Sequence, residues 1–177
     1  MKQSSKCALG GITAALSLVM MISVAIVPFM TYALPAIAGA LTVFMVVEVD
    51  KKWAFGVYAA VAILGMFLVP EKEVAVMYLA LFGYYPIVKA LIESKIPAVV
   101  GWLLKIILFE ITMVVSYILM IKFMGVTIDE MDTLGKLAIP ILLGAGTLAF
   151  IIYDFALTRL VSIYTRNWRK HFRRYFK

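Results

Sequence analysis

Six long apolar segments dominate this sequence. They fall at about 8–29, 31–47, 53–69, 74–92, 97–124 and 137–158, and charged residues or Gly and Pro separate them. Each approaches the roughly 17 to 25 residues that an α-helix needs to cross the hydrocarbon of a bilayer. The segments are continuously apolar rather than alternating, which favours helices over a closed β-barrel. We therefore predict an all-α integral membrane protein, built as a six-transmembrane-helix bundle.

The composition supports this class. Of the 177 residues 64% are hydrophobic and only 15% are charged, and the mean hydropathy is +1.02. A soluble domain is closer to half apolar. We expect one transmembrane domain over residues 1–160 and a basic, aromatic tail helix over residues 161–177.

The boundary after the first segment has few signals. No charge separates the first two segments, and Pro28 and Pro35 are the residues that indicate a break. Residues 1–27 also resemble a signal peptide, with Lys2 and Lys6 before an apolar run. We predict a retained first helix, because the run is longer than the apolar region of a signal peptide.

The distribution of Lys and Arg predicts the orientation, because cytoplasmic loops carry an excess of both. With the N-terminus inside, the outer loops hold three basic residues, Lys72, Lys122 and Lys136. The inner segments then hold Lys2, Lys6, Lys51, Lys52, Lys89, Lys95, Arg159 and the whole tail. We predict that both termini are cytoplasmic in a multi-pass protein of the cell membrane.

Two charges interrupt the apolar segment 97–124. Lys105 can extend toward the headgroups or join a structural ion pair, whereas Glu110 falls near the middle of the span. A charge there costs on the order of 3 kcal/mol, so Glu110 should face the bundle interior or a water-filled cavity, or be protonated. Five residues rotate the two side chains about 140° apart, so each needs a partner on another helix. A ligand, ion or proton role for Glu110 and a buried structural hydrogen bond both remain open.

A second polar residue in the last segment supplies one such partner. Asp154 lies at a depth where it could meet Lys105 or Lys89, and we predict a structural ion pair between Lys105 and Asp154. Thr112 and Ser116 share the sector of Lys105. Their hydroxyls either line an interior or bond to helix carbonyls.

Further polar residues are candidates for a binding pocket. Tyr117 shares the sector of Glu110, and Tyr32 and Tyr78 fall toward the outer half of their spans. Tyrosines of membrane proteins also serve as interface or packing residues, and that alternative stays open.

Small residues mark the first segment. Gly11 and Ala15 are four positions apart, as are Gly10 and Ala14, which creates a smooth surface for close helix approach. This surface suits either internal packing or the docking of a partner.

The tail predicts binding to the membrane surface. Trp168 and Phe172 recur at helical spacing, with Arg169 and Arg173 beside them. Such a helix suits the anionic inner leaflet, so we expect the lipid bilayer rather than nucleic acid as its partner.

The residues do not favour catalysis, and we expect no enzyme, metal or cofactor. Cys7 is the single cysteine and His171, in the tail, the single histidine, too few for a zinc site or a Cys and His pair. The sequence contains neither a GxxxxGK[ST] loop nor a GxSG motif. A carboxylate pair of Glu110 and Asp154 is disfavoured by their different depths.

The chain resembles the S components of energy-coupling factor (ECF) transporters. The resemblance rests on six spans with both ends inside and on ALGGITAALSLVM, PFMTYALPAIAGAL, FGYYPIVKALIE and WLLKIILFE. It implies a bacterial cytoplasmic membrane, an outward ligand pocket capped by outer loops, and ATP hydrolysis by separate subunits. It also implies that the first helix presents small residues to a transmembrane coupling subunit; Gly11 and Ala15 replace the common Ala-xxx-Ala pattern.

From these features we expect a substrate-binding subunit of a micronutrient (vitamin-like) uptake transporter. The residues expected to bind the small-molecule ligand are Glu110, Ser116, Tyr117, Tyr32, Tyr78 and Thr147. A standalone proton-coupled transporter or channel that uses Glu110 is one alternative. A structural membrane assembly protein is another.

Overall fold

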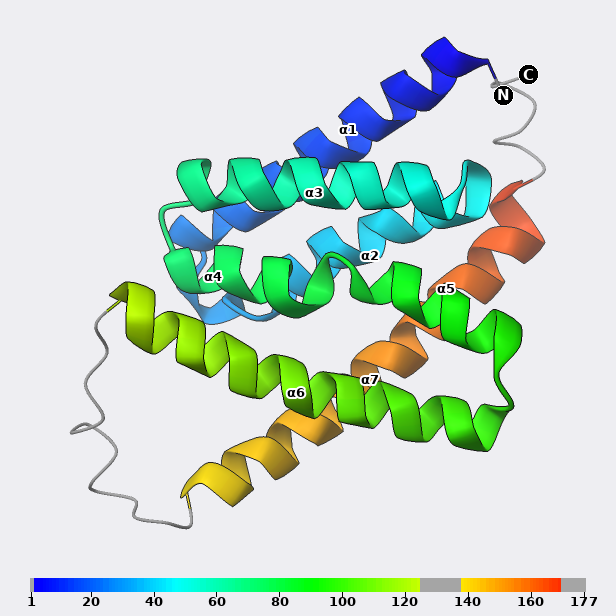
Figure 1. Cartoon of the computed structure of the whole chain (residues 1–177). Coiled ribbons are helices and arrows are strands. Elements are labelled where there is room, and N and C mark those ends of the chain that lie inside the picture. Colours follow the sequence, from blue (N-terminus) through cyan, green and yellow to red (C-terminus); the bar gives the residue numbers. More distant parts are fainter. Residues whose placement is uncertain (1, 125–137, 170–177) are drawn as a thin grey trace.

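The structure is a computed structural model that describes residues 2–124 and 138–169. Within these ranges every regular element is helical and no strand is present, which confirms the all-α class. Figure 1 shows a bundle in which some helices run side by side and others, including the first and the last, cross them obliquely.

Three helices form the N-terminal part of the bundle. They are α1 (Gln3–Ile22), α2 (Ala33–Glu48) and α3 (Lys51–Leu68). α1 packs on both of the others, and a Cβ at Gly10 would lie 3.2 Å from Val57 of α3 and 3.6 Å from Met45 of α2. The uncertain first boundary is a real break, because 3₁₀ turns at Ser23–Ala25 and Pro28–Met30 separate α1 from α2.

The fourth segment is divided near its middle. α4 (Lys72–Met77) continues into a π-helical turn (Tyr78–Phe82), and α5 (Tyr85–Lys95) follows after Gly83. Pro86 lies in the first turn of α5 and has no N–H to donate, and its ring would clash with the carbonyl four residues earlier. A regular α-helix therefore cannot run through this point.

Two long helices complete the described chain. α6 (Ala98–Met124) follows α5 after a short turn, and α7 (Ala138–Ile163) continues into a second π-helical turn (Tyr164–Trp168). The predicted domain boundary at residue 160 falls inside this continuous helical segment. Residues 170–177 of the expected tail lie outside the described residues.

Five helical segments are long and apolar enough to cross a membrane: Gln3–Ala25, Lys51–Leu68, Lys72–Lys95, Ala98–Ser116 and Leu143–Asn167. The helix Ala33–Glu48 is apolar but has 16 residues, a rise of roughly 24 Å at 1.5 Å per residue. Large apolar side chains also cover the outside, including Ile63, Phe67 and Ile152, each at least 60% exposed. These features are compatible with a multi-pass membrane protein, because such a surface is stable against lipid rather than water.

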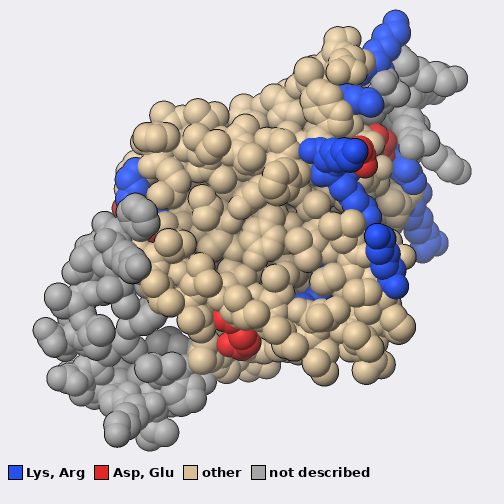
Figure 2. All heavy atoms as spheres, viewed as in Figure 1, with Lys and Arg blue, Asp and Glu red and all other residues tan. Residues whose placement is uncertain are grey.

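Basic residues gather at one end of the bundle, here called the basic end. The start of α1, the connection from α2 to α3, the turn from α5 to α6 and the end of α7 all lie there (Figure 1). Figure 2 shows Lys and Arg atoms gathered at this side of the visible face and a wide uncharged surface beside them. The basic residues at or next to these helix ends are Lys2, Lys6, Lys51, Lys52, Lys95, Arg166 and Arg169.

Candidate functional site

Four ionisable side chains from three helices meet inside the bundle toward the basic end. We call them the ionic cluster: Lys89 and Glu93 of α5, Lys105 of α6 and Asp154 of α7. Lys89 Nζ lies 2.6 Å from Asp154 and 2.7 Å from Glu93. Lys105 Nζ lies 2.6 Å from Glu93 and 3.2 Å from Asp154.

The charges of the ionic cluster balance, since two ammonium groups face two carboxylates. The Tyr85 hydroxyl donates a further hydrogen bond to Asp154, and the Tyr85 ring packs edge-on against Phe150, 4.9 Å between centroids. Removing charge from water is costly unless each charge is paired and hydrogen-bonded. The cluster meets this requirement and joins α5, α6 and α7.

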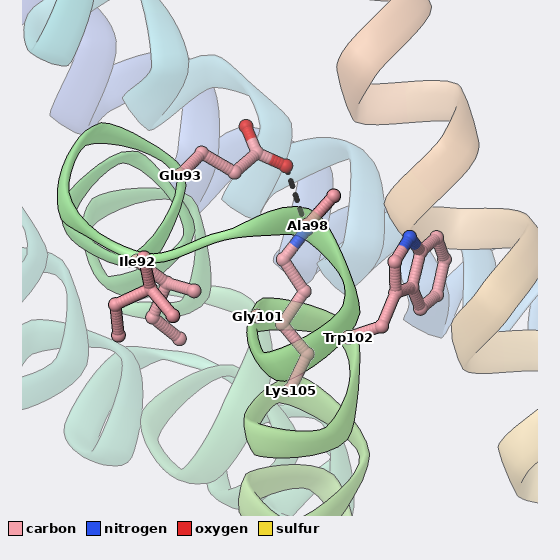
Figure 3. A pocket seen from close by; sticks show the side chains of 7 residues that line it. Ile92, Glu93, Ala98, Gly101, Trp102 and Lys105 are labelled. Carbon is pink, nitrogen blue, oxygen red and sulfur yellow. Dashed lines mark hydrogen bonds and ion pairs between the residues drawn. The ribbon is translucent and has the colours of Figure 1, made fainter.

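A pocket of about 270 Å³ opens beside the ionic cluster, at the turn from α5 to α6. Figure 3 shows Glu93 of α5 above Lys105 of α6, with Ile92 on one side and the Trp102 ring on the other. Lys105 Nζ lies 5.2 Å from the centre of the Trp102 ring, a cation–π distance. This pocket lies near the basic end, whereas the sequence predicted a pocket toward the opposite, outer side.

Glu110 and Thr147, two predicted binding residues, contact each other. The Thr147 hydroxyl of α7 lies 2.6 Å from Glu110 Oε1 of α6 and also 2.8 Å from the Leu143 carbonyl. Both residues are partly buried. Thr147 is the hydrogen-bond partner of Glu110 among the described residues, so this carboxylate faces a neutral group, unlike those of the ionic cluster.

α2 and α3 pack against the fourth segment at the point where its helix is interrupted. Tyr58 of α3 donates a hydrogen bond of 2.7 Å to the Leu79 carbonyl within the π-helical turn. Gly39 of α2 allows the closest approach, because a Cβ there would overlap the Phe82 carbonyl. A Cβ at Gly83 would likewise overlap the ring of Tyr58. π-Helical turns inside α-helices are frequent at functional sites, and this one is held in place by specific contacts.

The other predicted pocket residues are dispersed. Tyr32 donates a 3.0 Å hydrogen bond to Glu73 at the end opposite the basic end. Partial burial, and then the neighbouring Glu73 carboxylate, raise the pKa of the Tyr32 hydroxyl. Tyr78 is fully buried, with its ring centre 6.2 Å from that of Tyr58. Ser116 donates to the Thr112 carbonyl of its own helix at 2.8 Å.

One of the two predicted polar sectors of α6 follows the predicted arrangement. Lys105, Thr112 and Ser116 are all buried, so their shared sector faces the bundle. The Thr112 hydroxyl lies 2.8 Å from that of Tyr84. The side chain of Tyr117 lies outside the described residues.

The two small-residue pairs of α1 face different surroundings. Gly10 is buried against α2 and α3, while Gly11 and Ala15 are exposed and a Cβ at Gly11 would meet nothing within 4 Å. Ile12 and Leu16 beside them are also exposed. The pair selected from the sequence for partner docking is therefore on the outer surface of the described bundle.

One predicted membrane-surface residue contacts the bundle. Arg169 Nε lies 3.3 Å from Oε1 of Glu48, whose side chain is buried at the end of α2. The side chain of Trp168 and the residues Phe172 and Arg173 lie outside the described residues.

Sequence reasoning named Lys89 as a possible partner of Asp154 but missed Glu93 and Tyr85. The signal for Glu93 was available, because Lys89 and Glu93 are four positions apart and therefore neighbours on one helix face. The part of the chain that the structure describes contains no group of three or more His, Cys, Asp or Glu residues placed to hold a metal ion.

No family model, curated protein or solved structure matches this chain.

Proposed function

We propose that this protein is a non-enzymatic, six-span substrate-binding subunit of a micronutrient uptake transporter in the bacterial cytoplasmic membrane, with both termini inside. It captures a small ligand from the extracellular side and works with a separate transmembrane coupling subunit and ATPase subunits. The resemblance to S components of ECF transporters motivates the proposal.

The observation that carries the ligand-binding part is the contact between Glu110 and Thr147. Glu110 lies near the middle of the 27-residue helix α6, where an acidic side chain is costly and is most often retained for function. The ionic cluster has a structural explanation, because its charges neutralise each other. Glu110 has only a neutral partner among the described residues. Its carboxylate is therefore the better anchor for a ligand that carries hydrogen-bond donors.

The exposed pair Gly11 and Ala15 supports the partner-binding part. Without a hydrophobic driving force between helices in lipid, close contact through small residues supplies packing energy. α1 offers such a surface on the outside of the bundle, where the described chain leaves it uncovered. A coupling subunit that packs a helix there would need no charged contact.

Gentle purification followed by native mass spectrometry tests both parts. We expect a retained small molecule and co-purifying membrane and ATPase subunits. Gly11→Leu should abolish co-purification of the subunits and leave the small molecule bound. Gly56→Leu on α3 is the matched control, because Gly56 is also exposed and a Cβ there meets nothing within 4 Å. Co-purification unchanged by Gly11→Leu would contradict the docking surface.

A standalone proton-coupled transporter is the second candidate. It is favoured by the position of Glu110 near the middle of α6, because acidic residues inside membrane spans often belong to ion or proton pathways. Reconstitution of the purified chain alone in liposomes separates the two candidates. Uptake driven by a pH gradient and lost in Glu110→Gln supports the transporter, whereas uptake that requires added ATPase subunits supports the capture subunit.

A further inference from the structure

The pocket at the turn from α5 to α6 combines an apolar wall with two opposite charges. Its polar groups come from Glu93 and Lys105, and its remaining lining comes from Ile92, Ile96, Ala98, Gly101 and Trp102. Its volume of about 270 Å³ suits a small polar group rather than an extended ligand. It is separate from Glu110 and Thr147, so a role for it does not depend on the function proposed above.

Glu93 is the member of the ionic cluster that an incoming ligand can reach. Its side chain is 47% exposed, whereas those of Lys105 and Asp154 are 4% and 2% exposed. Both lysines contact Oε1 of Glu93. In Figure 3 the second carboxylate oxygen points away from Lys105. That oxygen is left to accept hydrogen bonds from a ligand that reaches the exposed carboxylate, without displacing either lysine.

The charge balance restricts the chemistry of the ligand. An anion would have to compete with Glu93 for the two buried lysines and would add an unbalanced negative charge to a neutral cluster. A group with N–H donors and a positive charge meets the exposed carboxylate directly. A ligand that also carries a negative charge farther out remains neutral overall. These conditions describe a zwitterion with a primary ammonium group.

The exposed residues around the pocket indicate that this zwitterion belongs to a membrane lipid. The pocket lies at a short turn between two apolar helices, a position that reaches the headgroup level when the helices cross the membrane. Val99, Val100 and Leu103 next to it are all more than half exposed, and Trp102 is partly exposed, which suits acyl chains and an interfacial aromatic residue.

We propose that this pocket binds the headgroup of an amine-bearing zwitterionic phospholipid, of the phosphatidylethanolamine type. The ammonium group donates hydrogen bonds to the Glu93 carboxylate. The phosphate stays at the mouth of the pocket, and the acyl chains follow the exposed apolar face at the start of α6. A quaternary choline headgroup has no N–H and cannot make the same hydrogen bonds.

The test compares two lipids that differ only in the headgroup. The full-length protein is reconstituted in vesicles with equal amounts of phosphatidylethanolamine and phosphatidylcholine of identical acyl chains, extracted in mild detergent, and examined for retained lipid by native mass spectrometry. We expect preferential retention of phosphatidylethanolamine. Glu93→Gln should reduce the preference roughly tenfold or more, because a charge-assisted hydrogen bond is lost.

Two further variants keep the test independent of folding defects. Ala98→Trp fills the mouth of the pocket from an exposed position, keeps the ionic cluster intact, and should also remove the preference. Asp50→Asn removes an exposed carboxylate from the same end of the bundle, keeps a good N-cap for α3, and should leave the preference unchanged. Equal retention of the two lipids by the unmodified protein, or a preference that survives Ala98→Trp, would overturn the proposal. Retention of soluble phosphoethanolamine in place of the lipid would overturn it as well.

Discussion

Lys105 Nζ lies 3.2 Å from the carboxylate of Asp154, although 49 positions separate the two residues in the chain. The contact joins α6 to α7, and Lys89 and Glu93 extend it to α5. Most of the other residues of these helices are apolar, so lipid competes with their packing on nearly equal terms. Paired buried charges therefore determine which faces of α5, α6 and α7 contact one another.

Removing one charge of the ionic cluster should destabilise the bundle strongly. Asp154→Asn leaves two buried ammonium groups with one carboxylate, and breaking such a pair costs about 3–5 kcal/mol. The double variant Lys105→Met with Asp154→Leu leaves Lys89 and Glu93 balanced, so its loss should be smaller than the sum of the single losses. The free energy of unfolding in mixed micelles measures this, with the exposed Lys52→Met as the control. Additive losses would contradict a coupled cluster.

Gly39→Ala should destabilise the packing of α2 on the fourth segment. The new Cβ would overlap the Phe82 carbonyl, which is backbone and cannot move aside as a side chain can. We expect a loss of about 2 kcal/mol or more in the free energy of unfolding. Gly56→Ala makes the same chemical change where nothing lies within 4 Å and should change stability by less than about 1 kcal/mol. Equal effects at the two positions would show that the close approach is not required.

Tyr58→Phe should loosen the π-helical turn of the fourth segment. The variant removes the donor of the 2.7 Å hydrogen bond to the Leu79 carbonyl and leaves a partly buried acceptor, which costs roughly 1–3 kcal/mol. Hydrogen exchange of the amides in residues 78–84 should increase. Tyr32→Phe, which removes an exposed hydroxyl bonded to Glu73, is the comparison and should leave exchange in this turn unchanged.

Thr147→Val and Glu110→Gln should both weaken retention of the small molecule that co-purifies with the protein. Each variant alters the contact between Thr147 and Glu110, and we expect a roughly tenfold or larger loss of affinity, the value of a hydrogen bond to a charged group. Thr158→Val is the matched control on α7, because the Thr158 hydroxyl donates to the carbonyl of Asp154 in its own helix. A ligand retained equally by all three variants would place the binding site elsewhere.

The sequence was sufficient to predict several features, because they depend on local composition and helical period. The apolar segments predicted an all-α membrane protein, and the sector of Lys105, Thr112 and Ser116 is buried as its spacing indicates. The need of Glu110 for a partner on another helix also followed from the cost of a charge at that depth. The partner, Thr147, is 37 positions away.

The break in the fourth segment and the membership of the ionic cluster required coordinates. Pro86 excludes a regular α-helix through this point but does not specify the form of the break, and the π-helical turn also depends on the Tyr58 donor and on the space at Gly39. Likewise, the sequence places Glu93 near the end of a helix, where an acidic residue is usually solvated. The packing of α6 is what brings Lys105 into contact with it. Hydropathy is a property of each stretch of chain, whereas such contacts depend on the rotation and the neighbours of every helix, which are set when the whole bundle packs.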